Sequence, residues 1–211
     1  MRAVIFDFDG TIADSFGTVI EIAYQLTKLD QLADLDKVKW MRDNNVGLAQ
    51  ALKGLKISKW KLLWLLQRGR RLMADRIKQV PVFPGLEEVL RTLKQNRFQL
   101  YIVSTNSRSN VERFLKEKNL ESYFNRIYGG VGLLEKDKVI KRVLKHERLD
   151  PSSAIYVGDE VRDIEAAKRL GMPCAAVAWG YNSDVLLASY APMVVVRTPQ
   201  QLEKVLTEWG R

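Results

Sequence analysis

Residues 3–11 read AVIFDFDGT and join an apolar run to two carboxylates and a glycine. The run from Ala3 to Phe6 is apolar at every position, which is typical of a strand buried on both faces of a parallel sheet. Asp7 and Asp9 follow directly, and like charges this close cannot both stay ionised without a compensating group. This stretch therefore predicts a buried first strand with a polar site at its end.

The rest of the chain divides into two parts with different patterns. Residues 15–80 carry apolar residues at helical spacing, for example within 19–26, and show no convincing strand. After the Pro- and Gly-containing stretch 80–85, helical and strand patterns alternate. Helices are expected at 86–95, 109–118, 138–146, 163–170 and 199–209, and strands at 99–103, 126–128, 154–157, 174–178 and 193–196. We therefore expect an α/β fold with a doubly wound, mostly parallel sheet formed by residues 1–14 and 81–211, into which 15–80 is inserted.

The composition is that of a globular protein of 211 residues, 46% hydrophobic and 28% charged. No apolar run approaches the roughly 18 residues that a membrane span needs, and the N-terminus shows no signal-peptide pattern. The single cysteine, Cys174, excludes an internal disulfide framework and suits a reducing compartment. We expect a cytoplasmic protein that makes no membrane contact and is a monomer or a small homo-oligomer.

The carboxyl ends of three expected strands carry the polar residues of most interest, because open α/β sheets bind ligands at this edge. These residues are Asp7 and Asp9, the run Ser104-Thr105-Asn106, and the run Gly158-Asp159-Glu160. Several carboxylates gathered there require a cation. Oxygen ligands select a hard ion, and Mg²⁺ fits best because it also binds substrate phosphate. The only histidine, His146, is expected within a helix, which argues against a zinc site and against a Ser-His-Asp hydrolase.

These residue types can perform nucleophilic catalysis by a carboxylate. An aspartate attacks an electrophilic phosphorus and forms a covalent aspartyl-phosphate, which water then hydrolyses. A second acid protonates the leaving alcohol and later activates the water. An aspartate two residues further on emerges on the same side of the strand end and can reach the leaving group. Hydroxyl and backbone N–H groups would hold the phosphate oxygens, and a lysine would offset their charge.

Three motifs resemble those of the haloacid dehalogenase superfamily, and in particular of its small phosphatases similar to phosphoglycolate phosphatase. FDFDGT (6–11) matches the first motif of that superfamily, IVSTN (102–106) resembles the second, and VGDEVRD (157–163) resembles the fourth. The resemblance covers essentially the whole chain. It implies a Rossmann-like core with a small helical cap, here residues 15–80, that closes over the substrate.

The resemblance also implies the roles of individual residues. Asp7 would be the nucleophile and Asp9 the general acid/base. The metal ligands would be Asp7, the backbone carbonyl of Asp9, Asp159, and Asp163, the last acting through water or as an orienting partner. The phosphate-binding residues would be Gly10, Thr11, Ser104, Thr105 and Asn106. Strand register gives Ser104 the hydroxyl and Thr105 a backbone N–H, although these two could exchange roles.

The third motif of the superfamily is a lysine at the start of a helix, and the sequence offers two candidates. Glu135-Lys136-Asp137-Lys138 lacks the proline that often follows this lysine in relatives. The spacing to Asp159 favours Lys136, with Lys138 as the alternative.

Asp9 favours phosphoryl transfer, because dehalogenases of the superfamily lack an acid two residues after the nucleophile. We expect a Mg²⁺-dependent phosphatase that hydrolyses a small phosphorylated metabolite. A phosphomutase uses the same two aspartates and remains an alternative. Candidate substrate contacts from the cap are Arg42, Asn44, Asn45 and the turn at Gly47.

The net charge of +9 is concentrated in one stretch. Between Lys53 and Lys78, nine basic residues stand against one acid, Asp75, which leaves +8 there. Such a field attracts anions, so the stretch could frame the entrance for an anionic substrate or bind nucleic acid. The alternative is a helix face that is only exposed to solvent. Nucleic-acid binding through this basic cap is kept as an alternative, although Trp60 and Trp64 lie four apart among leucines, as on the buried face of a helix.

Overall fold

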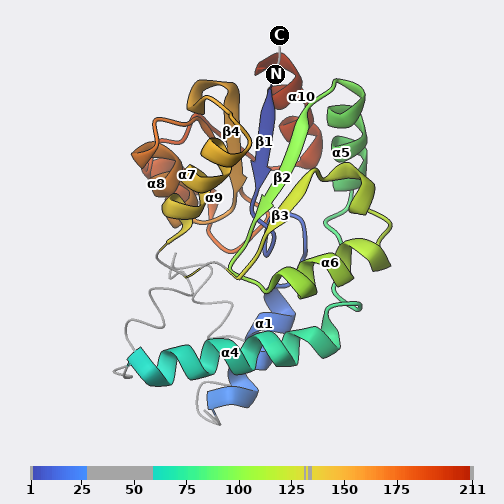
Figure 1. The fold of residues 1–211 in the computed structure, drawn as a ribbon, viewed down its shortest axis with the longest axis vertical. Coiled ribbons are helices and arrows are strands. Elements are labelled where there is room, and N and C mark those ends of the chain that lie inside the picture. The colour runs from blue at the N-terminus through green and yellow to red at the C-terminus, as the bar shows by residue number, and fades with distance from the viewer. Residues whose placement is uncertain (1, 28–58, 131, 133–134, 210–211) are drawn as a thin grey trace.

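The computed structural model describes residues 2–27, 59–130, 132 and 135–209, which form one parallel sheet with helices on both faces (Figure 1). The sheet has six strands in the order β3-β2-β1-β4-β5-β6, and every neighbouring pair is parallel. The strands are β1 (Ala3–Phe6), β2 (Gln99–Val103), β3 (Arg126–Tyr128), β4 (Ala154–Gly158), β5 (Cys174–Val177) and β6 (Val194–Val196). The prediction of an α/β fold around a parallel sheet is confirmed.

The first strand lies in the middle of the sheet, between β2 and β4. Its last residue, Phe6, pairs with Ile102 on one side and Val157 on the other. All four residues of β1 are fully buried, as the unbroken apolar run predicts. Because β1 ends level with its two neighbours, the residues that follow these three strands come together at one edge of the sheet, called the carboxyl edge below.

Alternate residues of β1 enter two separate hydrophobic clusters, because side chains of a strand point to opposite faces. Val4 and Phe6 join the cluster beneath α5 (Leu86–Gln95), α6 (Arg108–Glu117) and α10 (Pro199–Trp209). Ala3 and Ile5 join the cluster beneath α7 (Lys136–His146), α8 (Val161–Arg169) and α9 (Asp184–Ser189). Two short 3₁₀ helices, η1 (Glu121–Tyr123) and η2 (Pro151–Ser153), lie in the connections. Figure 1 shows α5 and α10 on one side of the sheet and α7 to α9 on the other.

Two helices of the inserted segment stand beyond the carboxyl edge. These are α1 (Phe16–Thr27) and α4 (Lys59–Arg76), which contact each other away from the sheet (Figure 1). The candidate substrate contacts Arg42, Asn44, Asn45 and Gly47 lie outside the described residues. Among the described helices, none combines the length and the apolar character needed to cross a membrane.

Two helices at the carboxyl edge begin earlier than their sequence patterns predict. Helix α7 begins at Lys136 rather than Lys138, and α8 begins at Val161 rather than Asp163. In α8 the carboxylate of Asp163 accepts a hydrogen bond from the N–H of Glu160 (3.1 Å), which closes the first turn. Apolar spacing did not reveal these first turns, because polar side chains that serve the site occupy them.

Helix α9 was not expected at all. It spans six residues, which is too short for an apolar period to be recognised. Its start is marked instead by Ser183, whose side chain accepts a hydrogen bond from the N–H of Leu186.

Candidate active site

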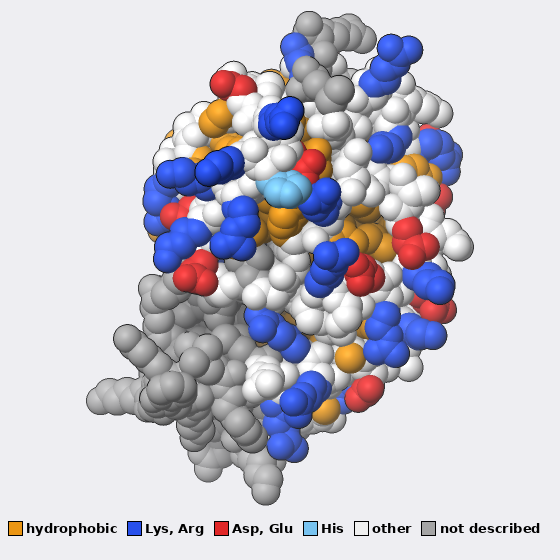
Figure 2. Space-filling view, in the orientation of Figure 1, with side chains coloured by type: hydrophobic (Ala, Val, Ile, Leu, Met, Phe, Trp, Pro, Cys, Tyr) orange, Lys and Arg blue, Asp and Glu red, His pale blue; other side chains and the backbone are white. Residues whose placement is uncertain are grey.

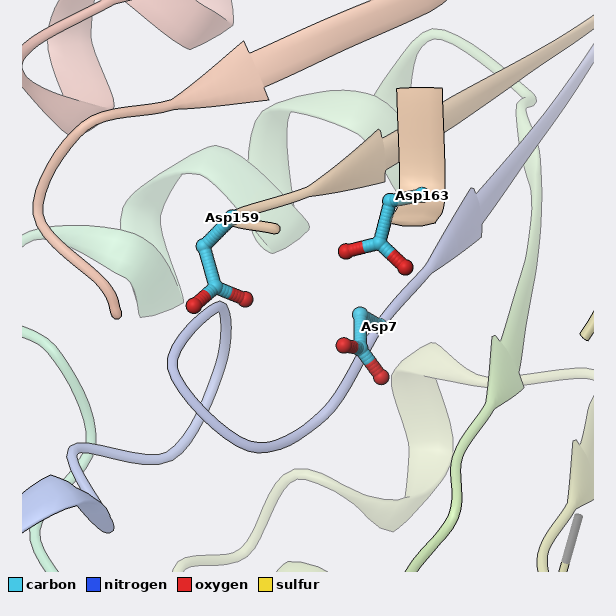
Figure 3. A group of neighbouring side chains, drawn as sticks. All are labelled: Asp7, Asp159 and Asp163. Atoms are coloured by element: carbon cyan, nitrogen blue, oxygen red, sulfur yellow. The ribbon is translucent and has the colours of Figure 1, made fainter. Parts of the chain in front are cut away.

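Three aspartates meet at the carboxyl edge, as Figure 3 shows. Asp7 follows β1, Asp159 follows β4, and Asp163 lies in the first turn of α8. One carboxylate oxygen of each lies within 4.8 Å of the other two. All three residues are buried, with at most 2% of their surface exposed. We call Asp7, Asp159 and Asp163 the acid cluster.

Lys136 is the cation that joins this cluster. Its Nζ lies 2.8 Å from Oδ2 of Asp7 and 2.5 Å from Oδ1 of Asp163, and the residue is 2% exposed. Lys138 instead pairs with Glu135 on the surface, at 3.3 Å. The side chain of Lys136 shares one face of α7 with Ile140 and Val143, which lie four and seven residues further on and are buried. That i, i+4, i+7 pattern is the sequence signal that separates the two lysines.

The charges in the acid cluster are not fully paired. Burial raises the pKa of Asp7 to about 7, although the charge of Lys136 acts in the opposite direction. Burial, together with the charges of Glu160 and Asp7, raises the pKa of Asp159 well above its usual range. For Lys136, burial acts to lower the pKa, but Asp163 and Asp7 outweigh it and raise the pKa. The site therefore holds more negative charge than its lysine offsets.

This imbalance fits a bound divalent cation. Three buried carboxylates at mutual ligand distance form an oxygen donor set, which suits a hard metal ion. A cation placed among them would remove the cost of keeping these carboxylates ionised and buried.

The Asp9 carboxylate has partners of its own outside the acid cluster. Its carboxylate accepts hydrogen bonds from the Ser15 hydroxyl (2.8 Å) and from the Asn106 side-chain amide (3.2 Å). The Ser15 hydroxyl also contacts the hydroxyl of Tyr181 (3.2 Å). Burial raises the pKa of Asp9, and the hydrogen bonds from Ser15 and Asn106 partly offset this effect. The two acids two residues apart thus occupy different environments.

The loop between the two acids and α1 depends on Gly10. Its φ of +83° is a left-handed conformation that favours glycine. A Cβ there would lie 2.2 Å from the carboxylate of Asp159 and 2.4 Å from the ring of Tyr181. The Gly10 N–H donates to the carbonyl of Ala13 (2.9 Å), and the Thr11 hydroxyl donates to Asp159 (2.8 Å). In this structure these two predicted phosphate-binding residues therefore hold the loop and orient Asp159.

The turn after β2 brings the other predicted phosphate-binding residues to the same edge. Oγ of Ser104 accepts from the N–H of Asn106 (2.9 Å). The Ser104 hydroxyl hydrogen and the Thr105 N–H have no acceptor in the described part of the chain. The Asn106 side chain is occupied by Asp9, by Asn110 and by the N–H of Ser107. Ser104 and Thr105 thus offer donors, whereas Asn106 orients an acid.

Three residues whose roles sequence reasoning missed also join the site. Tyr181 donates its N–H to Asp159 (2.7 Å), and Ser15 binds Asp9 as described. Arg162, in the first turn of α8, pairs with Glu160. A serine in a loop or an arginine at a helix start is unremarkable in sequence, so only the fold reveals these contacts.

Besides Ser15, helix α4 of the inserted segment reaches the site, at the turn after β2. Nε of Arg70 in α4 donates to the carbonyl of Thr105 (3.1 Å), and the Asn110 amide donates to the carbonyl of Arg70 (2.9 Å). Other members of the basic stretch pair with acids elsewhere, such as Arg76 with Glu21 (3.3 Å). Lys53, Lys56 and the side chains of Trp60 and Trp64 lie outside the described part, so nucleic-acid binding by this stretch stays a prediction.

Comparison with known proteins gives the chain a family and relatives along its whole length. The family model described as haloacid dehalogenase-like hydrolase matches residues 4–177. The chain is 33% identical to a phosphoglycolate phosphatase of Synechococcus elongatus, over 100% of both chains. It is 30% identical to a phosphoglycolate phosphatase of Aquifex aeolicus, which covers 98% of this chain and 97% of the relative. The crystal structure of a protein described as a predicted phosphatase, from Clostridium acetobutylicum, superimposes with a TM-score of 0.85 at 25% identity, over 98% of each chain.

Proposed function

The chain belongs to the haloacid dehalogenase-like hydrolases, and we propose that it hydrolyses a small phosphomonoester such as 2-phosphoglycolate. Its membership confirms the family and the enzyme class, a phosphatase-type hydrolase, that the motifs indicate. The observation that carries the proposal is the buried acid cluster with Lys136 bound to two of its members. The relatives named phosphoglycolate phosphatase support the substrate class.

Asp7 is the proposed nucleophile. One oxygen of its carboxylate accepts from the N–H of Phe8 (2.8 Å) and the other pairs with Lys136 (2.8 Å), so the group is fixed in orientation. Its oxygen attacks the phosphorus, the bond between phosphorus and the substrate's ester oxygen breaks, and an aspartyl-phosphate forms with release of the alcohol. Water then attacks the phosphorus and releases inorganic phosphate and the Asp7 carboxylate. Lys136 stabilises the ionised form of Asp7, which burial destabilises.

Asp9 is the proposed general acid and base. Because burial raises its pKa, Asp9 keeps its proton to a higher pH than an exposed aspartate does. Ser15 and Asn106 fix its carboxylate away from the acid cluster. Asp9 gives its proton to the leaving ester oxygen and takes one from the attacking water in the second step.

Asp7, Asp159 and Asp163, with the backbone carbonyl of Asp9, are the proposed ligands of Mg²⁺. When bound, this ion supplies Lewis-acid stabilisation to the phosphate oxygens and offsets the charge of the carboxylates. The Ser104 hydroxyl and the Thr105 N–H are the proposed phosphate donors, since neither has an acceptor in the described part of the chain. Arg70 of α4 contacts the carbonyl of Thr105, which supports residues 15–80 as a cap that reaches this turn.

The proposed location is the cytoplasm, a reducing compartment that is compatible with the buried free cysteine Cys174. A monomer or a small homo-oligomer stays our prediction for the state of assembly.

The test is phosphate release from 2-phosphoglycolate by the purified protein with Mg²⁺, with EDTA, and with EDTA followed by excess Mg²⁺. We expect turnover with Mg²⁺, loss with EDTA and recovery on re-addition. Turnover that persists unchanged in EDTA would contradict the metal ligands, and no turnover of any phosphomonoester would contradict the activity. Assaying the interconversion of sugar phosphates tests the alternative that the protein is a phosphomutase.

A further inference from the structure

Arg162 carries buried donors that have no acceptor in the part of the chain that the structure describes. The residue lies in the first turn of α8, between Asp159 and Asp163 of the acid cluster. Its Nη2 donates to the carboxylate of Glu160. Among the described residues, Nε and Nη1 of Arg162 are the only buried side-chain nitrogen or oxygen atoms without a hydrogen-bond partner. Buried polar groups are nearly always satisfied, so these donors require an acceptor that the described part of the chain does not supply.

The arginine also acts electrostatically on the proposed reacting groups. Its charge lowers the pKa of both Asp7 and Asp9, against the larger effect of burial on each. The other buried cation at this edge, Lys136, already donates to two aspartates. An anion that binds beside the acid cluster would therefore find its unmet donors on Arg162 rather than on Lys136.

The chemistry of the guanidinium indicates the shape of the missing acceptor. Its N–H groups form a planar fork, and adjacent nitrogens bind the two oxygens of one carboxylate. Nη2 has two hydrogens, so it can donate one to Glu160 and still share a carboxylate with Nη1 or with Nε. About a fifth of the side chain is exposed (21%), so Arg162 is not sealed in the protein interior.

We propose that Arg162 is a specificity-determining residue that binds a carboxylate of the substrate while the phosphate lies at Asp7. This inference rests on the proposed function and narrows it, because it selects phosphomonoesters that carry a carboxylate a few bonds from the phosphorus. Glu160 holds the guanidinium in place, so little side-chain freedom is lost when the carboxylate binds.

A matched pair of phosphonates tests the binding without turnover. The first, 3-phosphonopropionate, has the phosphonate and the carboxylate; in the second, propylphosphonate, a methyl group replaces the carboxylate. Calorimetric titration in Mg²⁺ buffer should show that the wild-type protein prefers the first by about 10- to 100-fold, the range for hydrogen bonds between charged groups. The preference should fall to about twofold or less in Arg162→Gln and be partly retained in Arg162→Lys, which keeps the charge but loses the fork.

Arg169→Gln is the matched control, because Arg169 lies on the same helix, is mostly exposed and pairs at 3.5 Å with Asp137. It should keep the full wild-type preference. Thermal unfolding of each variant establishes that the protein is folded during the titrations. A wild-type protein that does not distinguish the two phosphonates, or an Arg162→Gln protein that distinguishes them as well as wild type, overturns the proposal.

Kinetics separate this inference from the proposed function. We expect Arg162→Gln to lose about 10- to 100-fold in kcat/KM for 2-phosphoglycolate while kcat/KM for ethyl phosphate changes by about twofold or less. Equal losses on both substrates would assign Arg162 a structural or purely electrostatic role and overturn the proposal, with the phosphatase activity intact. Absence of turnover together with a phosphonate preference that depends on Arg162 would overturn the proposed activity but keep the carboxylate site.

Discussion

The two ends of helix α7 hold two polar clusters that differ in how completely their charges are paired. At its start, Lys136 enters the buried acid cluster and pairs with two of its three carboxylates. At its end, Glu147 accepts from the hydroxyls of Tyr128 (2.7 Å) and Tyr101 (3.2 Å) and pairs with Arg126 (3.3 Å). His146, the pale blue side chain in Figure 2, lies on the surface and contacts the Glu147 carboxylate (3.1 Å).

The pKa directions of the two clusters are opposite. Burial raises the pKa of Asp7 to about 7, and Lys136 does not reverse it. For Glu147, burial acts to raise the pKa, but hydrogen bonds from Tyr128 and His146 and the charge of Arg126 hold it below its usual range. A cluster that satisfies its own charge stabilises the fold, whereas a buried cluster with surplus charge is prepared for a ligand. The predictions below test this distinction.

The largest expected effect is that of Asp7→Asn. The amide has the same shape but cannot attack phosphorus, so kcat/KM for a phosphomonoester should fall by about four orders of magnitude. The melting temperature should show that the variant is folded. The matched Glu147→Gln variant, at the other end of α7, should keep wild-type turnover. An Asp7→Asn protein with more than a few per cent of wild-type activity would contradict the nucleophile.

The next effect compares two lysines in the first turn of α7. Lys136→Ala removes the ammonium that pairs with Asp7 and should lower kcat by about two to three orders of magnitude. Lys138→Ala removes an exposed pair with Glu135 and should change kcat by about twofold or less. Initial rates, measured below the melting temperature of each variant, compare the two values of kcat. A similar loss of kcat in both variants would show that neither lysine of α7 has a specific role in catalysis.

The smallest effect concerns stability at the second cluster. Glu147→Gln should lower the free energy of unfolding by about 1 kcal/mol at pH 7, since the amide loses a charge-assisted acceptor. Because the folded-state pKa of Glu147 is lowered, its contribution is present above the ordinary value of 4.5 and is lost as the pH falls through the folded-state value. Urea unfolding of both proteins at pH 7 and at pH 3.5 measures this. An unchanged difference at pH 3.5 would show that the ionised carboxylate does not stabilise the fold.

Much of the fold could be predicted because its signals are local. The unbroken apolar run of β1, the alternation after residue 80 and the polar strand ends are all visible in the sequence. The convergence of Asp7, Asp159 and Ser104 at one edge was expected from these strand ends, whereas the strand order, with β1 between β2 and β4, comes from the structure. The starts of α7 and α8 were missed because their first turns carry polar side chains.

The finer design of the site could not be predicted, because it depends on contacts between residues far apart in the chain. Ser15 and Tyr181, which are in contact, lie 166 positions apart, and the sequence around either residue does not indicate the contact. Whether Gly10 and Thr11 donate to a ligand or to the protein is likewise decided only when Ala13 and Asp159 are in place. The unmet donors of Arg162 are recognised only when the side chains of the described residues are placed around it.

The most direct test of the central claim is to find the phosphoryl group on the protein. The enzyme is mixed in excess with a ³²P-labelled phosphomonoester and Mg²⁺, quenched in acid within the first turnover, and digested into peptides. We predict label on the peptide that contains Asp7, its release by hydroxylamine, and its absence in Asp7→Asn. Label on another residue, or substrate consumed with no labelled peptide at any time, would contradict the account.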